Sequence, residues 1–368
     1  MTPPMLKPAL KIGAFVASCI IYACTIFAAY GGRFNTDIFT FPAVMTLLLP
    51  WFATATLVIT ILWFCFRKYI PGAIGVVAIL CSWGPISTVS PLGHSKKATP
   101  GAQTFTIMTY NIIHGWDQEH KNAKRNRTID YIMETDPDIV CLQEVKKLTT
   151  TGDVTNFTPE QQAELKKKYP YEVGDPNLDM KLLSKYPAVF EKGYSYIYDD
   201  YDNRRYTFYK ININGHHLLV INVHLMSFLL SEKERKIVTG IHSIEDARES
   251  VVEFKGMRQK FHRGFKKRKK DVDILRKTID KLKGNIIICG DFNDVPESYA
   301  YRLLRGTDLK DAYVETGFGP LVTYNQHAFW FHLDQMLYRG DLKALNIRKG
   351  KTKVSDHYPV IAEFEFTN

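Results

Sequence analysis

The sequence predicts a mixed α/β (α+β) domain that follows a membrane region. Long stretches with almost no charge occupy the front of the 368-residue chain. The remainder contains short β-branched runs that end in polar residues and alternate irregularly with helix-like segments. The long apolar stretches have the length of bilayer-spanning helices, whereas the short runs have the composition of strands covered on both faces.

Three apolar stretches predict three transmembrane helices. They lie at about residues 12–30, 41–66 and 70–88. Each is close to the roughly 20 residues that a helix needs to cross a bilayer. The third contains Pro71, Gly72 and Pro85, residues that membrane helices tolerate. Because a cleaved signal peptide would account for the first stretch alone, we expect residues 1–88 to form a membrane region.

Charge in the short loops predicts the orientation of this region. The basic residues are Lys7 and Lys11 before the first stretch, Arg33 before the second, and Arg67 and Lys68 before the third. Because positively charged loops stay in the cytoplasm, the N-terminus is expected there. Lys96 and Lys97, after the third stretch, argue weakly for the opposite orientation. We expect an integral protein of the cell (inner) membrane whose large domain is extracytoplasmic.

A change of composition separates the membrane region from the large domain. Residues 89–103 are rich in Ser, Pro, Gly and Lys, which predicts a short linker. Residues 104–368 are enough for one large core. The helix-like segments of this domain lie near residues 121–135, 158–168, 231–262, 266–283 and 297–305.

Cysteine usage gives no metal motif. Four of the six cysteines lie in the apolar stretches, and Cys141 and Cys289 lie in predicted strands. No zinc-binding spacing is present, and we expect these two to be small buried hydrophobic residues rather than a disulfide or ligands.

One strand end is the most informative motif of the chain. The apolar run 285–288 leads into Cys289-Gly290-Asp291-Phe292-Asn293. Asp291 and Asn293 are two residues apart, so on an extended backbone both side chains point the same way. One can accept a proton or hold a water while the other orients a phosphate oxygen. As an isolated pattern, the pair is equally typical of an ordinary turn.

Other apolar runs end in polar residues of the same kind. These residues are Asn111 after 106–110, Gln143 and Glu144 after 138–142, His224 after 218–223, and Ser355, Asp356 and His357 before 358–366. Asp334 lies within the hydrophobic run 331–337. Because Asp is rarely buried without a partner, we expect one, and His357 is a candidate.

In this order, the polar residues resemble the endonuclease/exonuclease/phosphatase superfamily, which includes pancreatic-type deoxyribonucleases, abasic-site endonucleases, neutral sphingomyelinases and inositol polyphosphate 5-phosphatases. The resemblance covers roughly residues 104–366. It is carried by Asn111, Gln143-Glu144, Ser184-Lys185-Tyr186-Pro187, His224-Leu225, Gly290-Asp291-Phe292-Asn293, Asp334 and Ser355-Asp356-His357. The resemblance implies a four-layer α/β/β/α sandwich of two mixed sheets. It also implies hydrolysis of phosphoester bonds with Mg²⁺ as the cofactor and Mn²⁺ as the alternative.

The resemblance also implies a role for each site residue. Glu144 would bind the metal, with Asn111 beside it and Asp356 as a second oxygen ligand, as suits a hard cation. Asp291 would orient or deprotonate the attacking water, with Asn293 as its partner. His357, held by Asp334, would contact the phosphate and stabilise the transition state.

Other candidate contacts keep two interpretations each. His224 is either a general acid or phosphate contact, as in several branches of the family, or a strand-end histidine with a structural hydrogen bond. Asn203, Arg204 and Arg205 precede a predicted hairpin whose turn is Asn214-Gly215. An arginine there would grip a phosphate bidentately, or the group is a solvated strand start. His332 stands where many relatives carry arginine, which leaves substrate contacts open.

The natural substrate is the open question. The net charge of +10 and the basic run 266–270 would attract polyanions, either nucleic acid or anionic lipid headgroups. The run is equally typical of a solvated helix face. Because fixing a site near the bilayer raises its effective concentration toward membrane-borne substrates, a lipid-linked phosphoester is favoured. The alternatives are a membrane-bound nuclease acting on DNA or RNA and an inactive binding module. Apart from the bilayer and the substrate, no partner is predicted.

Overall fold

The computed structural model describes residues 6–115, 125–145, 157–175, 179–192, 206–231, 234, 247–326 and 329–368. Asn203, Arg204 and Arg205 lie outside these ranges, so the predicted substrate contacts stay predictions. The front of the predicted helix at 121–135 and most of residues 231–246 also lie outside them.

Two mixed sheets of six strands each form the large domain. The first has the order β13-β14-β1-β2-β4-β3, and the second has the order β5-β6-β7-β8-β12-β9. The strands of the first are β1 (Thr104–Asn111), β2 (Ile139–Gln143), β3 (Tyr171–Val173), β4 (Met180–Ser184), β13 (Leu342–Lys349) and β14 (Val360–Phe366). Those of the second are β5 (Ala188–Phe190), β6 (Tyr206–Ile213), β7 (His216–His224), β8 (Asn285–Asp291), β9 (Lys310–Asp311) and β12 (Asp334–Arg339). In each sheet one central pair is parallel, β1 with β2 and β7 with β8. The two mixed sheets agree with the predicted fold class.

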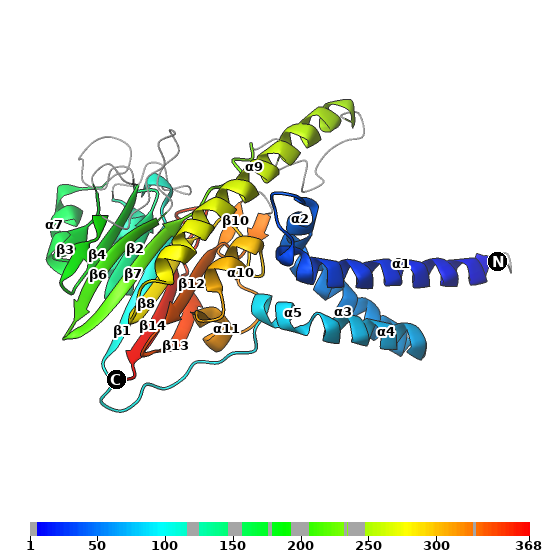
Figure 1. Ribbon diagram of the computed structural model, residues 1–368, viewed down its shortest axis with the longest axis horizontal. Helices are drawn as coiled ribbons and strands as arrows, with labels where there is room; N and C mark the ends of the chain where they lie inside the picture. Colours follow the sequence, from blue (N-terminus) through cyan, green and yellow to red (C-terminus); the bar gives the residue numbers. More distant parts are fainter. Residues whose placement is uncertain are drawn as a thin grey trace.

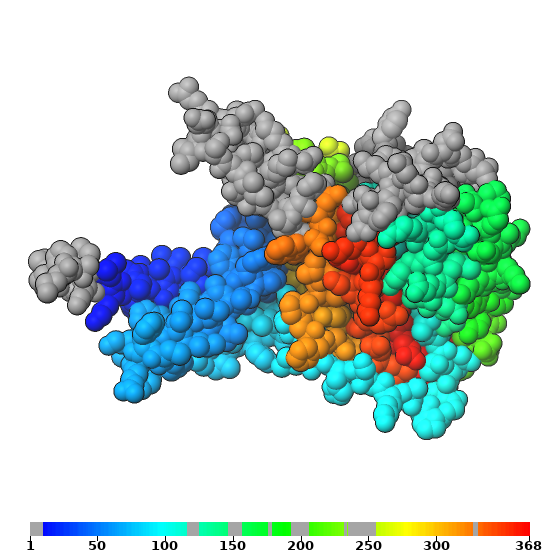
Figure 2. Space-filling view, turned by 180° about the vertical axis from the view of Figure 1, so that it is seen from behind, coloured from blue at the N-terminus to red at the C-terminus, as the bar shows by residue number. Residues whose placement is uncertain are grey.

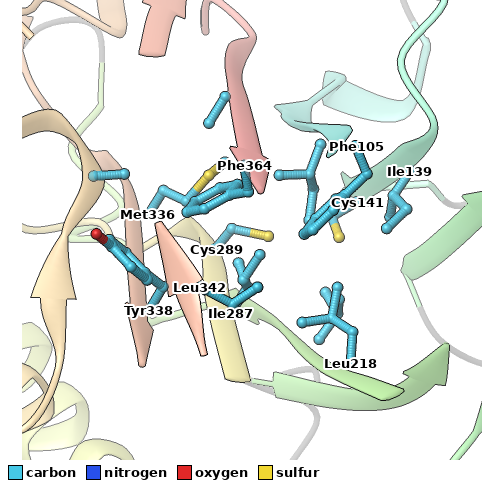
Figure 3. Close-up of a cluster of buried hydrophobic side chains, with 14 of the residues drawn as sticks. Phe105, Ile139, Cys141, Leu218, Ile287, Cys289, Met336, Tyr338, Leu342 and Phe364 are labelled. Atoms are coloured by element: carbon cyan, nitrogen blue, oxygen red, sulfur yellow. The ribbon is translucent and has the colours of Figure 1, made fainter. Parts of the chain in front are cut away.

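The main hydrophobic core lies between the two sheets. Phe105 and Cys141 from the first sheet face Ile287 and Cys289 from the second, as Figure 3 shows. Both cysteines are buried and free, as predicted. Successive side chains of a strand point to opposite faces of the sheet. The residues between these core positions therefore point to the outer faces, where helices can cover them.

Helices cover the outer face of each sheet. On the first sheet, α6 (Arg127–Thr135) and α7 (Pro159–Lys168) pack on residues of β1 and β2. On the second, α9 (Ala247–Ile279) and α10 (Tyr299–Arg305) pack on β6, β7 and β8 (Figure 1). A short helix, α11 (Ala312–Thr316), and a two-stranded hairpin, β10 (Tyr324–Gln326) with β11 (Phe329–Phe331), precede β12.

Some element boundaries differ from those predicted. The helices expected at 231–262 and 266–283 are joined in α9, because Phe261, Phe265 and Arg268 all pack on the ring of Phe228 across the expected break. Asp334 begins a strand instead of lying inside one. The β6–β7 hairpin has its predicted turn, with positive φ at both Asn214 and Gly215.

The membrane region differs from three straight helices. Its helices are α1 (Leu6–Tyr30), α2 (Phe41–Leu47), α3 (Leu49–Cys65), α4 (Tyr69–Cys81) and α5 (Trp83–Val89), with a 3-10 turn η1 (Gly31–Arg33). Only α1 among the described helices is long and apolar enough to span a membrane by itself. The pairs α2–α3 and α4–α5 bend by 63° and 67°, and three spans result only if each bent pair counts as one. The bends lie just before Pro50 and Pro85, which stand in the first turns of α3 and α5, because proline has no backbone N–H and cannot continue the hydrogen bonds of the preceding helix.

The N-terminal helices lie at one end of the large domain. α1, α3 and α4 extend away from it, whereas α2 and α5 lie against it (Figures 1 and 2). Residues 89–103, the predicted linker, run along the domain surface and contact it through an ion pair and hydrogen bonds. Lys96 forms an ion pair of 2.9 Å with Glu315, and the Thr99 amide donates to Glu365 at 2.6 Å.

Candidate active site

The predicted site residues meet at one edge of the two sheets. In the parallel pair β7–β8, His224 lies opposite Asp291, and in the antiparallel pair β8–β12, Asp334 lies opposite Asp291. In the first sheet, Asn111 at the end of β1 lies opposite Gln143, the residue before Glu144. The carboxyl ends of parallel strands meet at the same edge of a sheet, so these registers explain why residues far apart in the sequence converge.

Close approach of two strands requires glycine beside Asp291. Gly290 has φ +142°, and a Cβ at this position would lie 1.9 Å from the carbonyl oxygen of Val223. Any other residue would separate β7 from β8 at the point where they carry His224 and Asp291.

Asp291 lies at the centre of the cluster and is 1% exposed. Its Oδ1 accepts from the Asn293 amide at 2.8 Å, and its Oδ2 accepts from Asn293 Nδ2 at 3.2 Å and Asn111 Nδ2 at 3.1 Å. Burial raises the pKa of Asp291 to about 6, although the neighbouring His357 and His224 favour its ionised form. A carboxyl group that titrates near neutrality can serve as a general base.

His357 lies between two carboxylates. Its Nδ1 is 2.8 Å from Asp334 Oδ2, and its Nε2 is 3.5 Å from Asp291 Oδ2. Asp334 is fixed in turn, because its backbone amide donates to the Thr323 hydroxyl at 3.0 Å. Burial lowers the pKa of His357, but Asp334 and Asp291 outweigh it and hold that pKa well above its ordinary value. The predicted partnership of Asp334 with His357 is present.

Glu144 faces a second group of side chains. Its Oε1 accepts from Asn111 Nδ2 at 3.0 Å and lies 3.5 Å from His224 Nε2. Burial opposes ionisation, but His224 and the Asn111 amide outweigh it, so the pKa of Glu144 lies below its ordinary value. The Asn111 side chain donates to both Glu144 and Asp291, and it thereby joins the two groups.

Asp356 joins the cluster through Ser355. The Ser355 hydroxyl lies 3.2 Å from Asp356 Oδ1 and 2.8 Å from the carbonyl oxygen of Asn111. The loop before β14 is thereby tied to the end of β1, which fixes the backbone just before His357.

A metal ion would find oxygen donors in this cluster. Asp291, Asp334 and His357 are buried and each offers a ligand atom, all within 4.8 Å of one another, so this group could hold a metal ion. Asp334 Oδ1 is buried without a hydrogen-bond partner among the described residues. Glu144 offers an ionised carboxylate whose side chain is 26% exposed, which suits a hydrated cation.

Sequence reasoning missed three residues around the cluster. His114 Nε2 lies 3.9 Å from Glu144 Oε2, and the Tyr324 ring packs 5.0 Å from that of His357. Asn222 Oδ1 accepts from Gln143 Nε2 at 2.6 Å and joins the two sheets below the site. Asn222 lies within an apolar strand run, two residues before His224. A polar residue inside such a run was the feature of the sequence that could have marked it.

Comparison with known proteins identifies one family. The family profile described as "Endonuclease/Exonuclease/phosphatase family" matches residues 108–357. This range spans the described site residues from Asn111 to His357. No curated protein sequence matches the chain.

Solved structures with a similar fold share little sequence with the chain. TDP2 from D. rerio, complexed with single strand DNA product, is 15% identical and has a TM-score of 0.46, over 71% of this chain and 99% of that one. The human Nocturnin catalytic domain is 16% identical with a TM-score of 0.46, over 72% and 94%. An endonuclease/exonuclease/phosphatase from Bacteroides vulgatus is 15% identical with a TM-score of 0.43, over 72% and 99%.

Proposed function

The chain belongs to the Endonuclease/Exonuclease/phosphatase family, and from this premise we propose that it is a membrane-anchored, divalent-metal-dependent hydrolase of lipid-linked phosphoesters. The observation that carries the proposal is the convergence of Glu144, Asp291 and His357 on one point. Asn111 bridges the first two, and Asp291 lies 3.5 Å from His357. An acid–base pair and a metal-ligating carboxylate within one buried cluster are what phosphoester hydrolysis needs.

We propose that Mg²⁺, or Mn²⁺ in its place, is held by Glu144 and Asn111, with Asp356 nearby. When bound, it would polarise the phosphoryl group and stabilise developing negative charge. The group Asp291, Asp334 and His357 could also hold a metal ion, but we propose it for proton transfer, because both ring nitrogens of His357 already face carboxylates.

Asp291 is the proposed base for the attacking water. Asn293 donates to both of its carboxylate oxygens, which fixes the orientation of the carboxylate. A pKa of about 6 leaves Asp291 mostly ionised at pH 7 and able to accept the water proton.

The two histidines are proposed to act on the phosphate. His357, whose pKa Asp334 and Asp291 raise, would donate from Nε2 to a phosphoryl oxygen as negative charge develops. His224, whose Nε2 lies 3.5 Å from Glu144 and 4.0 Å from Asp291, would contact the phosphate or protonate the leaving group. An additional phosphate contact from Asn203, Arg204 or Arg205 stays a prediction.

The membrane region supports the choice of a lipid substrate. We propose that residues 1–88 cross the cell (inner) membrane three times, with each bent pair counted as one span. Residues 89–103 connect them to a hydrolase domain at 104–368 outside the cytoplasm. A site held this close to a bilayer meets membrane-borne phosphoesters at high effective concentration. The alternative substrate is DNA or RNA.

The test is a substrate comparison on the full-length protein in detergent or nanodiscs. We would assay release of phosphorylated headgroups from mixed phospholipid vesicles and nicking of plasmid DNA, each with Mg²⁺ and with chelator. Chelator-sensitive headgroup release supports the proposal. DNA nicking without lipid cleavage would show that the substrate is nucleic acid. Equal rates for wild type and Asp291→Ala on an activated phosphodiester would favour the binding module.

A further inference from the structure

The membrane region contacts the loop that follows Asp291 and Asn293. In η1, Gly32 lies against the backbone of Glu297, and a Cβ on Gly32 would be 1.8 Å from the Glu297 carbonyl oxygen. Glu297 itself has φ +69°, and the next residue, Ser298, caps α10 through a bond of 3.2 Å to the Tyr301 amide. A side chain at position 32 would therefore have to displace the loop between Asn293 and α10.

Apolar residues of the membrane region extend this contact to the segment that leads to Asp334. Ala43 and Leu47 of α2 are buried in one cluster with Val295, which follows Asn293 by two residues. The Trp51 ring of α3 packs edge-on against Phe331, with 5.6 Å between ring centroids. Phe331 and Leu333, the residue before Asp334, belong to the same cluster.

Polar contacts link the membrane region to α9 as well. Asp37 forms an ion pair of 2.8 Å with Lys269. The adjacent Arg268 is fully buried; its Nη1 donates to the Met226 carbonyl at 2.6 Å, and its Nε donates to Asp294 Oδ2 at 3.1 Å. Met226 lies two residues after His224, and Asp294 lies directly after Asn293. Arg268 of α9 therefore hydrogen-bonds to both loops that leave the catalytic edge of the second sheet.

We propose that residues 31–51 of the membrane region are a positioning element of the active site and not only an anchor. They touch none of the proposed reacting groups. They pack against the loop after Asp291 and the segment before Asp334. Through these two backbone segments, the membrane region holds both carboxylates in place. The inference rests on the proposed function, because it assumes that Asp291 and Asp334 act in hydrolysis. It requires that disturbing this contact lowers turnover even on a substrate that never enters a bilayer.

The experiment compares two glycine variants of the full-length chain in detergent. Gly32→Ala introduces the clash with Glu297, whereas Gly13→Ala in α1 is the control, because nothing lies within 4 Å of its Cβ position. The substrate is soluble bis(p-nitrophenyl) phosphate, assayed with Mg²⁺ or Mn²⁺. We expect Gly32→Ala to lower kcat by roughly ten- to a hundredfold, because small displacements of reacting groups cost that much, with KM little changed. The clash should also lower the thermal midpoint. Gly13→Ala should match wild type.

A second pair of variants decides the outcome if Gly32→Ala does not fold. Trp51→Ala should lower kcat, and Trp51→Phe should restore it by keeping a ring against Phe331. Trp83→Ala, which removes an exposed side chain of α5, is the control. Folded Gly32→Ala or Trp51→Ala protein with the kcat of wild type would overturn the positioning role alone. Wild type without chelator-sensitive activity would remove the proposed function and the positioning role with it.

Discussion

The two sheets meet at one active-site edge but supply it with side chains in different environments. The second sheet carries Asp291 and Asp334, which are 1% and 0% exposed and are fixed by neighbouring side chains or backbone amides. The first sheet leads to Glu144, whose side chain is 26% exposed. Under the roles proposed above, proton transfer takes place on the rigid, dry side, and the metal is bound on the side where water can complete a coordination shell.

Replacing Asp291 by Asn should have the largest effect. The amide keeps the shape of the carboxylate but cannot accept the water proton, so kcat should fall by roughly 10²–10⁴-fold. If the division between the sheets holds, the Mn²⁺ affinity, measured by isothermal titration calorimetry, should stay close to that of wild type. A parallel loss of metal affinity would place Asp291 among the ligands.

Replacing Glu144 by Gln should act on the metal instead. Loss of a ligating charge should raise the metal concentration that gives half-maximal activity by at least about ten- to a hundredfold. Losing a residue that only hydrogen-bonds to a metal ligand already has an effect of about this size. Activity should recover in part at high Mn²⁺. Glu160→Gln, a change in the first turn of α7, is the control. Unchanged metal dependence in Glu144→Gln would contradict the assignment.

The pH dependence should separate the two sides. Protonated Asp291 cannot accept a proton, and its pKa is raised to about 6, so kcat/KM should fall about tenfold per pH unit below that value. Glu144 has a lowered pKa and stays ionised further into the acid range. Mn²⁺ binding should therefore persist at a pH where hydrolysis is already lost. If Mn²⁺ binding and hydrolysis were lost with the same pH midpoint, one titrating group would control both.

The bond between the sheets should have the smallest effect. Asn222→Ala removes the acceptor of Gln143 Nε2 and the donor to the Leu142 carbonyl. Leaving these buried groups with fewer partners should cost about 1–3 kcal/mol of stability, measured as a lower thermal midpoint. Asn368→Ala at the exposed C-terminus is the control. An unchanged midpoint in Asn222→Ala would mean that the sheets hold together without this bond.

Much of the site was predictable because it follows strand periodicity. Asp291 and Asn293 stand two residues apart, and Glu144 and His224 each follow an apolar run, so the pattern alone marks the ends of buried strands. The need for a partner to buried Asp334 correctly favoured His357. His114 gave no such signal, since it lies in a turn with φ +62° outside any periodic run.

The helices show where composition alone fails. Hydropathy averages over a window and does not register the bends before Pro50 and Pro85, so the second and third stretches read as straight spans. Similarly, the expected break near Gly264 was overridden by the aromatic packing on Phe228, a contact between residues distant in sequence. Both errors arise because tertiary contacts and single prolines decide where a helix ends.

The bonded course of residues 89–103 has a mechanical consequence. Lys96 is paired to Glu315 and Thr99 is hydrogen-bonded to Glu365, so under the proposed anchoring the hydrolase domain would not move freely relative to the N-terminal helices. Under the same proposal, the site would stay at a constant height above the bilayer, and a phosphoester would reach it by lateral diffusion or from solution.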